Sequence, residues 1–444
     1  MKKILVIGCG GAGMFSSIVA TQLKPKKFKA TILSDEKDIY CRCSTPYIIT
    51  DKAKMKEAIQ PDSMITGYGV NVVKEKALRV DTKKKKVFTD HGTVFDYDLL
   101  VLSTGAAPFI PPIEGAKNAI PVRSSDDVKE IIKKSKKAKT ATIIGAGVIG
   151  IEMASALNEK GIKTSLMEFA DRPLAGIASK EYSEKILKTL EKNKIEVYLS
   201  SKATRIGDDF VEFEKEDVTK RLKSDLVILA SGVRANIEPI KDTPIKTNKF
   251  GILVDDKMRT NIKNVYACGD CAIPKSHITH EHVPSQLASS AIQQAKIVGY
   301  QIAGFPMKYG GSNNAFAFQF LGKEYAGAGI SEENARKHFR IVVIGNAKTT
   351  DVYKDMNEKE DLDLKLVFAG PRLRLVGVEA FGKGTISHVE TASFAITMKN
   401  NIFKLMKYNY IAHPSLTPWP FMNPLIMGCE DAMGKVTKKL HLTK

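Results

Sequence analysis

The sequence has few of the residues that build disulfide frameworks or membrane spans. Only 6 of its 444 residues are cysteine, and no apolar run reaches the ~20 residues that a helix needs to cross a bilayer. The start, Met1 to Gly8, briefly imitates a signal peptide, but its apolar run leads into a glycine-rich turn and not into a cleavage site. We therefore expect a buried first strand, a cytoplasmic chain with reduced thiols, and no membrane partner.

No nucleic-acid motif accompanies the positive charge of the chain. The formal net charge is +19, and much of it lies in lysine runs such as residues 83–86 and 133–139. We interpret most of these lysines as solvated loops and helix faces. Because aromatic residues are not interleaved with these lysines, we expect no nucleic-acid partner. A dinucleotide or an anionic thiol would suit the positive electrostatic field of the chain.

Strands alternate with helical patterns in the first half of the chain, which is typical of parallel sheets with crossover helices. Residues 3–7, 11–23 and 30–34 form one strand–helix–strand unit, and residues 141–167 repeat it. From about residue 313 the pattern changes. There we expect strands at 339–344 and 362–368, and helices near 386–399 and 423–439. The fold class is therefore α/β, with two Rossmann-type dinucleotide-binding domains followed by an α+β domain.

The first unit carries the G-x-G-x-x-G pattern between its strand and its helix. The first glycine permits the tight turn, the second lets the backbone approach a pyrophosphate, and the third lets the helix pack on the strand. Glu36, or its neighbour Asp35, lies where a carboxylate would accept a hydrogen bond from a ribose 2′-hydroxyl. The predicted contacts in this turn are Gly8, Gly10, Gly11, Ala12 and Gly13.

The second unit repeats both features, with Glu168 as its acid. A carboxylate there repels a 2′-phosphate, so NADH is favoured over NADPH, although Arg172 and Lys163 moderate that preference. One such glycine turn is weak evidence for a nucleotide site, whereas two in the right context are strong. The predicted contacts in this turn are Gly145, Gly147, Val148, Ile149 and Gly150.

Together with three further segments, these turns resemble the pyridine nucleotide–disulfide oxidoreductases, in their single-cysteine branch. Residues 103–106, with Thr104 and Gly105, and residues 230–236, with Gly232, match the family's two A-T-G turns. Residues 265–270, with Gly269 and Asp270, match its second FAD motif. The resemblance implies FAD and NAD(P)H as cofactors, Asp270 on the ribityl chain, and Glu152 as the acid near the nicotinamide.

The resemblance also bears on the cysteines near these motifs. Cys268 and Cys271 have a C-x-x-C spacing that could indicate zinc, but no second pair completes four ligands. Gly269 and Asp270 between them belong to the flavin motif. We expect both cysteines to be structural, Cys9 to be a small packed residue, and no metal site.

Cys43 is the candidate redox thiol, because residues 43–47 match the family's C-x-x-P-Y segment, whose cysteine faces the flavin. Thr45 and Pro46 predict an N-cap and first turn, so a short helix should begin just past Cys43. Its dipole, together with Arg42, would favour the thiolate over the thiol. That thiolate could attack a disulfide, or cycle through sulfenic acid when the oxidant is a peroxide.

Cys41 lies two residues before this thiol. The two-cysteine members of the family use a wider spacing, and a pair this close bridges only with strain. We interpret Cys41 as a bystander in preference to a resolving thiol.

Near the C-terminus, residues 411–418 partly resemble the His-Pro-Thr segment of lipoamide dehydrogenases and glutathione reductases. His413 is the candidate acid–base, and the alternative is a plain loop histidine beside a proline turn. The glutamate that orients this histidine in those enzymes is Pro418 here. Tyr410 is a second candidate proton donor and Tyr353 a weaker one.

The three predicted domains are an FAD-binding domain (1–112 with 243–312), an NAD(P)-binding domain (113–242) and an interface domain (313–444) of a homodimer. We expect an enzyme that passes electrons from NADH through FAD and Cys43 to a small disulfide, persulfide or polysulfide, such as one based on coenzyme A. The alternatives are an NADH oxidase or peroxidase, and an electron carrier or redox sensor with a protein partner.

Overall fold

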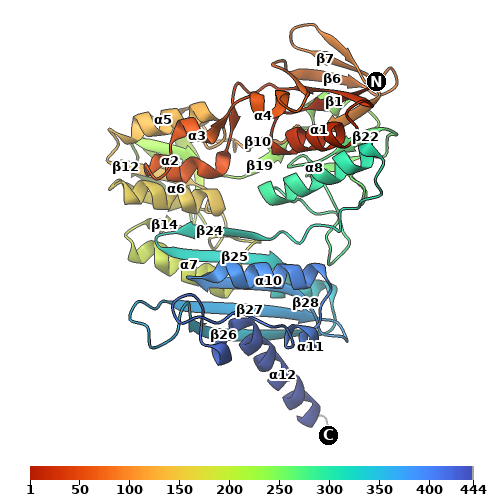
Figure 1. Cartoon of the computed structure of the whole chain (residues 1–444). Helices are drawn as coiled ribbons and strands as arrows, with labels where there is room; N and C mark the ends of the chain where they lie inside the picture. Colours follow the sequence, from red (N-terminus) through yellow and green to blue (C-terminus); the bar gives the residue numbers. More distant parts are fainter. Residues whose placement is uncertain (443–444) are drawn as a thin grey trace. The chain divides into compact units, whose positions relative to one another are not determined.

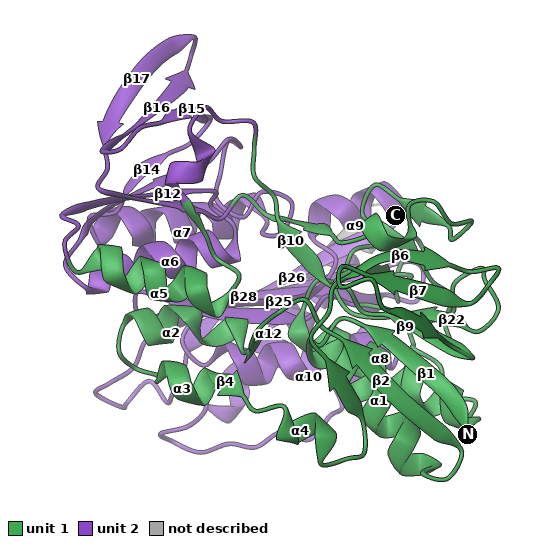
Figure 2. Cartoon of the chain, turned by 90° about the horizontal axis from the view of Figure 1, so that it is seen from above, with its two compact units in different colours: residues 1–111, 120–136, 231–312 green, residues 112–119, 137–230, 313–444 purple. Residues whose placement is uncertain are grey.

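A computed structural model describes residues 1–442 of the chain, with side chains as far as Lys438. The chain divides into two compact units (Figure 2). Unit 1 consists of residues 1–111, 120–136 and 231–312, and unit 2 holds residues 112–119, 137–230 and 313 onward. The α/β fold class is confirmed, and the division into three domains stays a prediction.

The core of unit 1 is a five-stranded parallel sheet. Its first strand, β1 (Lys2–Ile7), is apolar over its last four residues and buried there, as expected of a strand covered on both faces. Helices α1 (Gly11–Leu23) and α8 (Ala288–Ala303) lie side by side (Figure 1), so close at Gly299 that an added Cβ would lie 2.6 Å from Val19. The strand order is β22 (Val265–Ala267), β9 (Leu99–Leu102), β1, β2 (Phe28–Leu33) and β5 (Asn71–Val73).

Shorter elements complete unit 1. Helix α5 (Ser125–Ser135) begins with a capping box between Ser124 and Asp127. Strand β3 (Ile39–Tyr40) pairs antiparallel with β4 (Ile59–Gln60), and β10 (Ala106–Pro108) pairs antiparallel with β19 (Val233–Ala235). One antiparallel sheet contains β6 (Ala77–Asp81), β7 (Lys86–Thr89) and β8 (Val94–Asp96). In another small sheet, β21 (Gly251–Leu253) pairs antiparallel with β20 (Thr247–Asn248) and parallel with β23 (Ala272–Ile273). The remaining helices are α2 (Thr45–Ile49), α3 (Met55–Ala58) and α4 (Ser63–Thr66).

The first part of unit 2 is a second sheet of parallel strands. Its parallel strands run in the order β18 (Leu226–Leu229), β12 (Thr140–Ile144), β13 (Lys163–Met167) and β14 (Glu196–Tyr198). Helix α6 (Val148–Glu159) follows β12, and α7 (Lys180–Lys192) leads to β14. An antiparallel sheet of β15 (Lys202–Ile206), β16 (Phe210–Lys215) and β17 (Val218–Lys223) is attached.

The second part of unit 2 is an antiparallel five-stranded sheet. Helix α10 (Thr385–Thr397) contacts β25 and β28, and α12 (Pro424–Leu442) contacts β26 and β27. The short helices are α9 (Glu332–His338) and α11 (Ile402–Leu405). The strand order is β24 (Phe316–Phe320), β25 (Lys323–Gly329), β28 (Arg374–Gly382), β27 (Asp361–Ala369) and β26 (Val342–Thr350).

Of the two strands predicted for this sheet, one agrees with the structure and the other agrees only in part. The predicted strand 362–368 lies within β27, as its alternating pattern indicates. The predicted strand 339–344 is wrong over its first half, because α9 ends at His338 and the ladder begins only at Val342.

A row of polar contacts joins α7 to the antiparallel sheet. The backbone N–H of Ser179 donates to the Glu379 carboxylate at 2.7 Å. Tyr325 donates its hydroxyl to the same carboxylate oxygen at 2.6 Å, and the Lys365 ammonium lies 2.7 Å from Glu181. Glu379 and Lys365 are only 5% and 7% exposed, so removing one partner would leave a buried charge uncompensated. These contacts make the two sheets of unit 2 one compact body.

No helix within residues 1–442 combines the length and the apolar character that a bilayer crossing requires.

Candidate functional site

The first glycine turn combines two crowded glycines with an open one. Gly8 has φ +103°, and a Cβ there would lie 2.2 Å from the Ser103 carbonyl oxygen. A Cβ on Gly13 would lie 1.9 Å from the Gly8 carbonyl oxygen, because α1 packs directly on the turn. A Cβ on Gly10, by contrast, would meet nothing within 4 Å. The backbone is thus accessible at the one glycine where a pyrophosphate has to approach.

The second glycine turn repeats this geometry residue for residue. Gly145 has φ +110°, and a Cβ on Gly150 would lie 1.8 Å from the Gly145 carbonyl oxygen. Gly147 is the N-cap of α6 and faces open space, as Gly10 does before α1. Both helix N-termini are therefore arranged to receive the phosphates of a dinucleotide.

The two predicted ribose acids differ in their partners. Glu168 follows β13, and its two carboxylate oxygens accept the backbone N–H groups of Ala146 at 2.7 Å and of Ala170 at 2.8 Å. The carboxylate is thereby fixed beside the second glycine turn. Glu36 follows β2 in the same way, but its carboxylate forms an ion pair with Arg42. The first site therefore joins the ribose acid to the residue next to Cys43.

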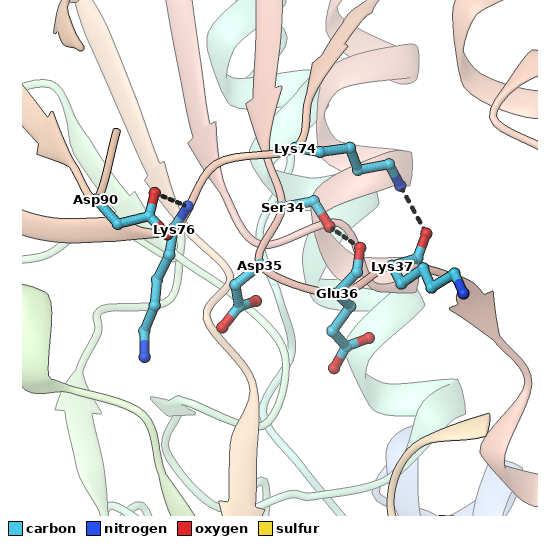
Figure 3. Close-up of a pocket in the computed structure, with 7 residues that line it drawn as sticks. All are labelled: Ser34, Asp35, Glu36, Lys37, Lys74, Lys76 and Asp90. Atoms are coloured by element: carbon cyan, nitrogen blue, oxygen red, sulfur yellow. Dashed lines mark hydrogen bonds between the residues drawn. The ribbon is translucent and has the colours of Figure 1, made fainter. Parts of the chain in front are cut away.

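A cavity of about 390 Å³ opens at the end of β2. Figure 3 shows the carboxylates of Asp35 and Glu36 on the same side of this loop, with Lys76 across from them. Lys74 donates to the Lys37 carbonyl at 3.3 Å and pairs with Asp62 at 3.2 Å. Burial raises the pKa of Cys9 in the glycine turn, and the charge of Lys74 opposes that rise. The position and polarity of the cavity suit the adenosine end of a dinucleotide.

The two A-T-G turns lie next to each other in unit 1. The Thr104 hydroxyl donates to the Asn236 carbonyl at 2.5 Å, and the Asn236 side chain donates back to the Thr104 carbonyl at 3.0 Å. Gly232 has φ +97°, and its carbonyl accepts the N–H of Phe109 at 2.8 Å. The antiparallel pair β10–β19 continues this contact. The two A-T-G turns are thus held together by hydrogen bonds and by a two-stranded ribbon.

Arg123 was missed by the sequence analysis, and the structure brings it into this site. Its guanidinium lies 3.9 Å from the Asp270 carboxylate, and a Cβ on Gly105 would lie 3.1 Å from its Nη2. Burial raises the pKa of Asp270, while the charges of Arg123 and Arg42 oppose that rise. The contact joins residues 147 positions apart along the chain, so no local pattern indicates it. The capping box that follows, at Ser124 and Asp127, fixes where Arg123 emerges.

Cys43 lies in a one-turn 3₁₀ helix, Arg42–Ser44, which leads directly into α2. The predicted short helix is present, but the predicted cap is wrong: the N-cap is Ser44, and Thr45 is already helical. The Thr45 hydroxyl is instead 2.8 Å from the hydroxyl of Tyr40. Arg42 Nε is buried without a hydrogen-bond partner among the described residues. Cys43 is exposed, which is the accessibility that an attacking thiol requires.

The other thiols of the flavin motifs are buried. Cys9 is 7% exposed, and burial raises its pKa to about 11. Cys268 and Cys271 are fully buried, and burial raises the pKa of both. Thiols in such surroundings stay protonated and unreactive. Among the described side chains, which end at Lys438, no three of His, Cys, Asp or Glu are grouped so as to hold a metal ion.

Glu152 lies on α6, one turn after Val148. Burial raises its pKa from 4.5 to about 7. Near neutral pH this carboxyl therefore exists in both protonation states, as suits a group that exchanges a proton or a hydrogen bond with a bound ring.

His413 lies in an exposed turn of unit 2. The backbone N–H of Ser415 points to its Nδ1 at 3.4 Å, and the Ser415 hydroxyl is 3.2 Å from the same nitrogen. A donating N–H makes Nδ1 the acceptor and leaves the proton on Nε2. Ser415 thus orients the His413 ring. The residue expected to do so is a glutamate, which is replaced by Pro418 in this sequence. The loop 413–417 is held by backbone hydrogen bonds from residues 416 and 417 to the His413 carbonyl, which the sequence pattern does not indicate.

The two tyrosines considered as alternative donors have other contacts. Tyr410 donates its hydroxyl to the Pro420 carbonyl at 2.8 Å. The Tyr353 ring packs edge-on against Trp419, and its backbone N–H bonds to the Pro414 carbonyl at 3.0 Å, beside His413. The hydroxyl proton of Tyr410 is therefore already donated, whereas among the described residues the contacts of Tyr353 involve its ring and its backbone and not its hydroxyl.

The predicted site residues fall into two groups. Unit 1 brings together the first glycine turn, Thr104, Gly105, Gly232, Asp270 and the Cys43 segment. Unit 2 contains the second glycine turn, Glu152 and Glu168, and separately the His413 turn.

Comparison with known proteins places the chain in a family. Residues 2–295 match the model of the pyridine nucleotide-disulphide oxidoreductases, and residues 316–420 match the dimerisation domain of the same family. The chain belongs to this family of FAD- and NAD(P)H-dependent enzymes. The predicted family, fold and cofactors are therefore confirmed.

Relatives give a closer view. A protein of Methanocaldococcus jannaschii named NADH oxidase is 31% identical over 98% of this chain and 100% of its own length. An NAD(P)H coenzyme A polysulfide/persulfide reductase of Pyrococcus horikoshii is 29% identical, covering 96% and 97%. The structure of an NAD-dependent persulfide reductase from A. fulgidus has the same fold, with a TM-score of 0.92 and 23% identity over 98% of this chain and 84% of that one.

Proposed function

We propose that this enzyme passes electrons from NADH, by way of FAD and Cys43, to a small disulfide, persulfide or polysulfide. The observation that carries the proposal is the exposed Cys43, in a turn that the Arg42–Glu36 ion pair ties to the first nucleotide site. The names of the persulfide-reducing relatives support the same acceptor class.

In this proposal the two glycine turns bind different nucleotides. FAD would be held by the open backbone at Gly10 and by the cavity beside Glu36. The other residues that would hold it are Thr104, Gly105, Gly232, Gly269, Asp270 and Arg123. Gly147 and the fixed carboxylate of Glu168 would hold NADH, with Glu152 near its nicotinamide. FAD, when bound, would accept a hydride from NADH and supply two electrons to the mixed disulfide formed on Cys43.

Cys43 would act as the nucleophile. Its thiolate attacks one sulfur of the acceptor disulfide, the S–S bond breaks, and one thiolate leaves. The remaining half is held on Cys43 as a mixed disulfide. Two electrons and a proton then release it as the second thiol and restore the Cys43 thiolate.

The acceptor would be anionic. The formal charge of +19 favours negatively charged ligands, and coenzyme A disulfide, coenzyme A persulfide and polysulfide are all anions. A thiol based on coenzyme A is therefore the acceptor that we propose first.

We also propose a homodimer in which His413 serves the partner subunit's Cys43 as acid–base. The turn around His413 exposes large apolar side chains: Ile411 is 84% exposed, Leu416 74% and Phe421 72%. Exposed apolar groups of this size mark interaction surfaces. Ile411 and Leu416 lie within the region 316–420 that matches the dimerisation-domain model, and Phe421 follows it directly. In its imidazolium form, His413 would give its Nε2 proton to the leaving thiolate and remain as the neutral ring.

A second candidate is an NADH oxidase or peroxidase, which the name of the M. jannaschii relative favours. There Cys43 would be oxidised to sulfenic acid by peroxide and then reduced. The glycine turns, Glu152 and Glu168 would have the same roles, so the acceptor alone separates the two functions.

The test is an acceptor screen with the FAD-loaded enzyme. NADH consumption is followed without oxygen on coenzyme A disulfide, coenzyme A persulfide and polysulfide, and in air without added disulfide. The proposal expects fast turnover on at least one sulfur acceptor and slow turnover in air. Fast turnover in air with slow turnover on every sulfur acceptor would establish the oxidase instead.

A further inference from the structure

The segment before α2 contains two thiols and not one. Cys41 and Cys43 are both exposed, whereas Cys9, Cys268, Cys271 and Cys429 are all buried. The two exposed thiols occupy one 3₁₀ turn, in which Cys41 is the N-cap and Cys43 the second helical residue. Every thiol that solvent reaches is therefore in this turn.

The backbone holds Cys41 firmly beside Cys43. The N–H of Cys41 bonds to the Ala58 carbonyl at 2.8 Å, at the end of the β3–β4 pair, and the Cys41 carbonyl accepts the N–H of Ser44 at 3.1 Å. The Ser44 hydroxyl donates to the Cys41 sulfur at 3.5 Å. This hydrogen bond and the two backbone bonds together fix the position of Cys41 in the turn.

A bridge between the two thiols would strain the turn that contains them. The separation of Cα atoms two residues apart depends on the dihedral angles of the residue between them, and Arg42 is helical. Helical dihedrals keep these Cα atoms within the ~4.4–6.8 Å that disulfides usually span. Side chains two residues apart on a helix do not face each other, so the turn has to open at Arg42 for the two sulfurs to meet.

We propose that Cys41 is the resolving thiol of Cys43. This inference rests on the proposed function and adds a step to it. After Cys43 has formed the mixed disulfide, the Cys41 thiolate attacks the Cys43 sulfur, the bond to the substrate half breaks, and that half leaves as a thiolate. The product is a Cys41–Cys43 disulfide, which takes two electrons and two protons to return to two thiols.

The step has a functional consequence for the choice of acceptor. Both halves of the substrate leave before any electrons arrive, so the second product does not wait for NADH. A short, exposed bridge is of the labile kind that is easily reduced. The turn would thus accept disulfides of different sizes, since none has to remain attached during reduction.

The test uses the FAD-loaded enzyme without NADH and with one equivalent per subunit of an aromatic disulfide whose thiol is coloured. The wild type is expected to release two coloured thiols per subunit and to lose two hydrogens in mass. Cys41→Ser is expected to release one thiol and to keep the aromatic half as an adduct on Cys43. Fragmentation of the peptide that contains residues 41–43 locates the bridge or the adduct.

The other outcomes separate the two claims. A stable aromatic adduct on Cys43 of the wild type would overturn the role of Cys41 and leave the proposed role of Cys43 intact. Release of two thiols by Cys41→Ser, without an adduct, would overturn it as well. If Cys43 gains neither an adduct nor a bridge in either protein, the proposed function itself fails.

Discussion

The carboxylate of Glu168 accepts the backbone N–H of Ala146, inside the second glycine turn, at 2.7 Å. The side chain that we propose to select the nucleotide is therefore fixed by the loop that we propose to bind its phosphates. Glu168→Gln keeps the size of the side chain and removes its charge, so a 2′-phosphate is no longer repelled. We expect the kcat/KM ratio of NADPH to NADH to rise about tenfold, equivalent to ~1.4 kcal/mol.

The matched control for this change is Glu184→Gln, which removes the same charge from an exposed site on α7. Its nucleotide preference should equal that of the wild type. A preference that stays unchanged in Glu168→Gln would remove Glu168 from the ribose site.

Gly147→Ala places a methyl group where a phosphate has to approach. Because nothing lies within 4 Å of that position, the free energy of unfolding should change by less than about 1 kcal/mol. The KM for NADH should rise at least about tenfold, while the FAD content stays unchanged. Gly434→Ala, also in open space, is the control. A normal KM in Gly147→Ala would contradict the nucleotide site.

Glu152→Gln should change how stability depends on pH. The unfolded carboxyl loses its proton near 4.5 and the folded one near 7, so wild-type stability falls as the pH rises between these values and is level above them. The variant lacks this loss. At pH 8 it should be more stable than the wild type by as much as ~3 kcal/mol, measured by denaturant unfolding at pH 4 and pH 8. An equal difference at both pH values would contradict the buried, titrating carboxyl.

His413→Gln should lower disulfide turnover about 100-fold, as expected for a lost general acid. If His413 serves the partner's thiol, mixing this variant with Cys43→Ser and allowing subunits to exchange should restore activity, because each heterodimer then has one intact site. Mixtures that stay inactive after exchange would contradict the partner's role. Ser415→Ala should lower turnover less and shift its pH profile, since it removes only the hydroxyl beside Nδ1.

Features set by neighbouring residues could be predicted from the sequence. The glycine turns are an example, because the spacing of Gly8, Gly10 and Gly13 alone decides which glycine is crowded and which is open. The strand β27 was found for the same reason, as its side chains alternate.

Features set by distant residues could not be predicted. Arg123 reaches Asp270 across the fold of unit 1, and Glu36 pairs with Arg42 only because the loop after β2 turns back. The strands β25 and β28 were missed because glycines such as Gly327 and Gly377 interrupt their pattern. A Cβ on Gly377 would lie 2.0 Å from the Ile330 carbonyl oxygen, so only glycine fits there, and a Cβ on Gly327 would lie 3.1 Å from the Phe316 ring.

The most direct test of the account is the Cys43→Ser variant of the FAD-loaded enzyme, mixed without oxygen first with NADH and then with coenzyme A disulfide or polysulfide. The account predicts that the yellow flavin is retained and bleached by NADH at the normal rate, and that the added acceptor then draws no further electrons. Steady turnover of the sulfur acceptor by this variant would contradict the account.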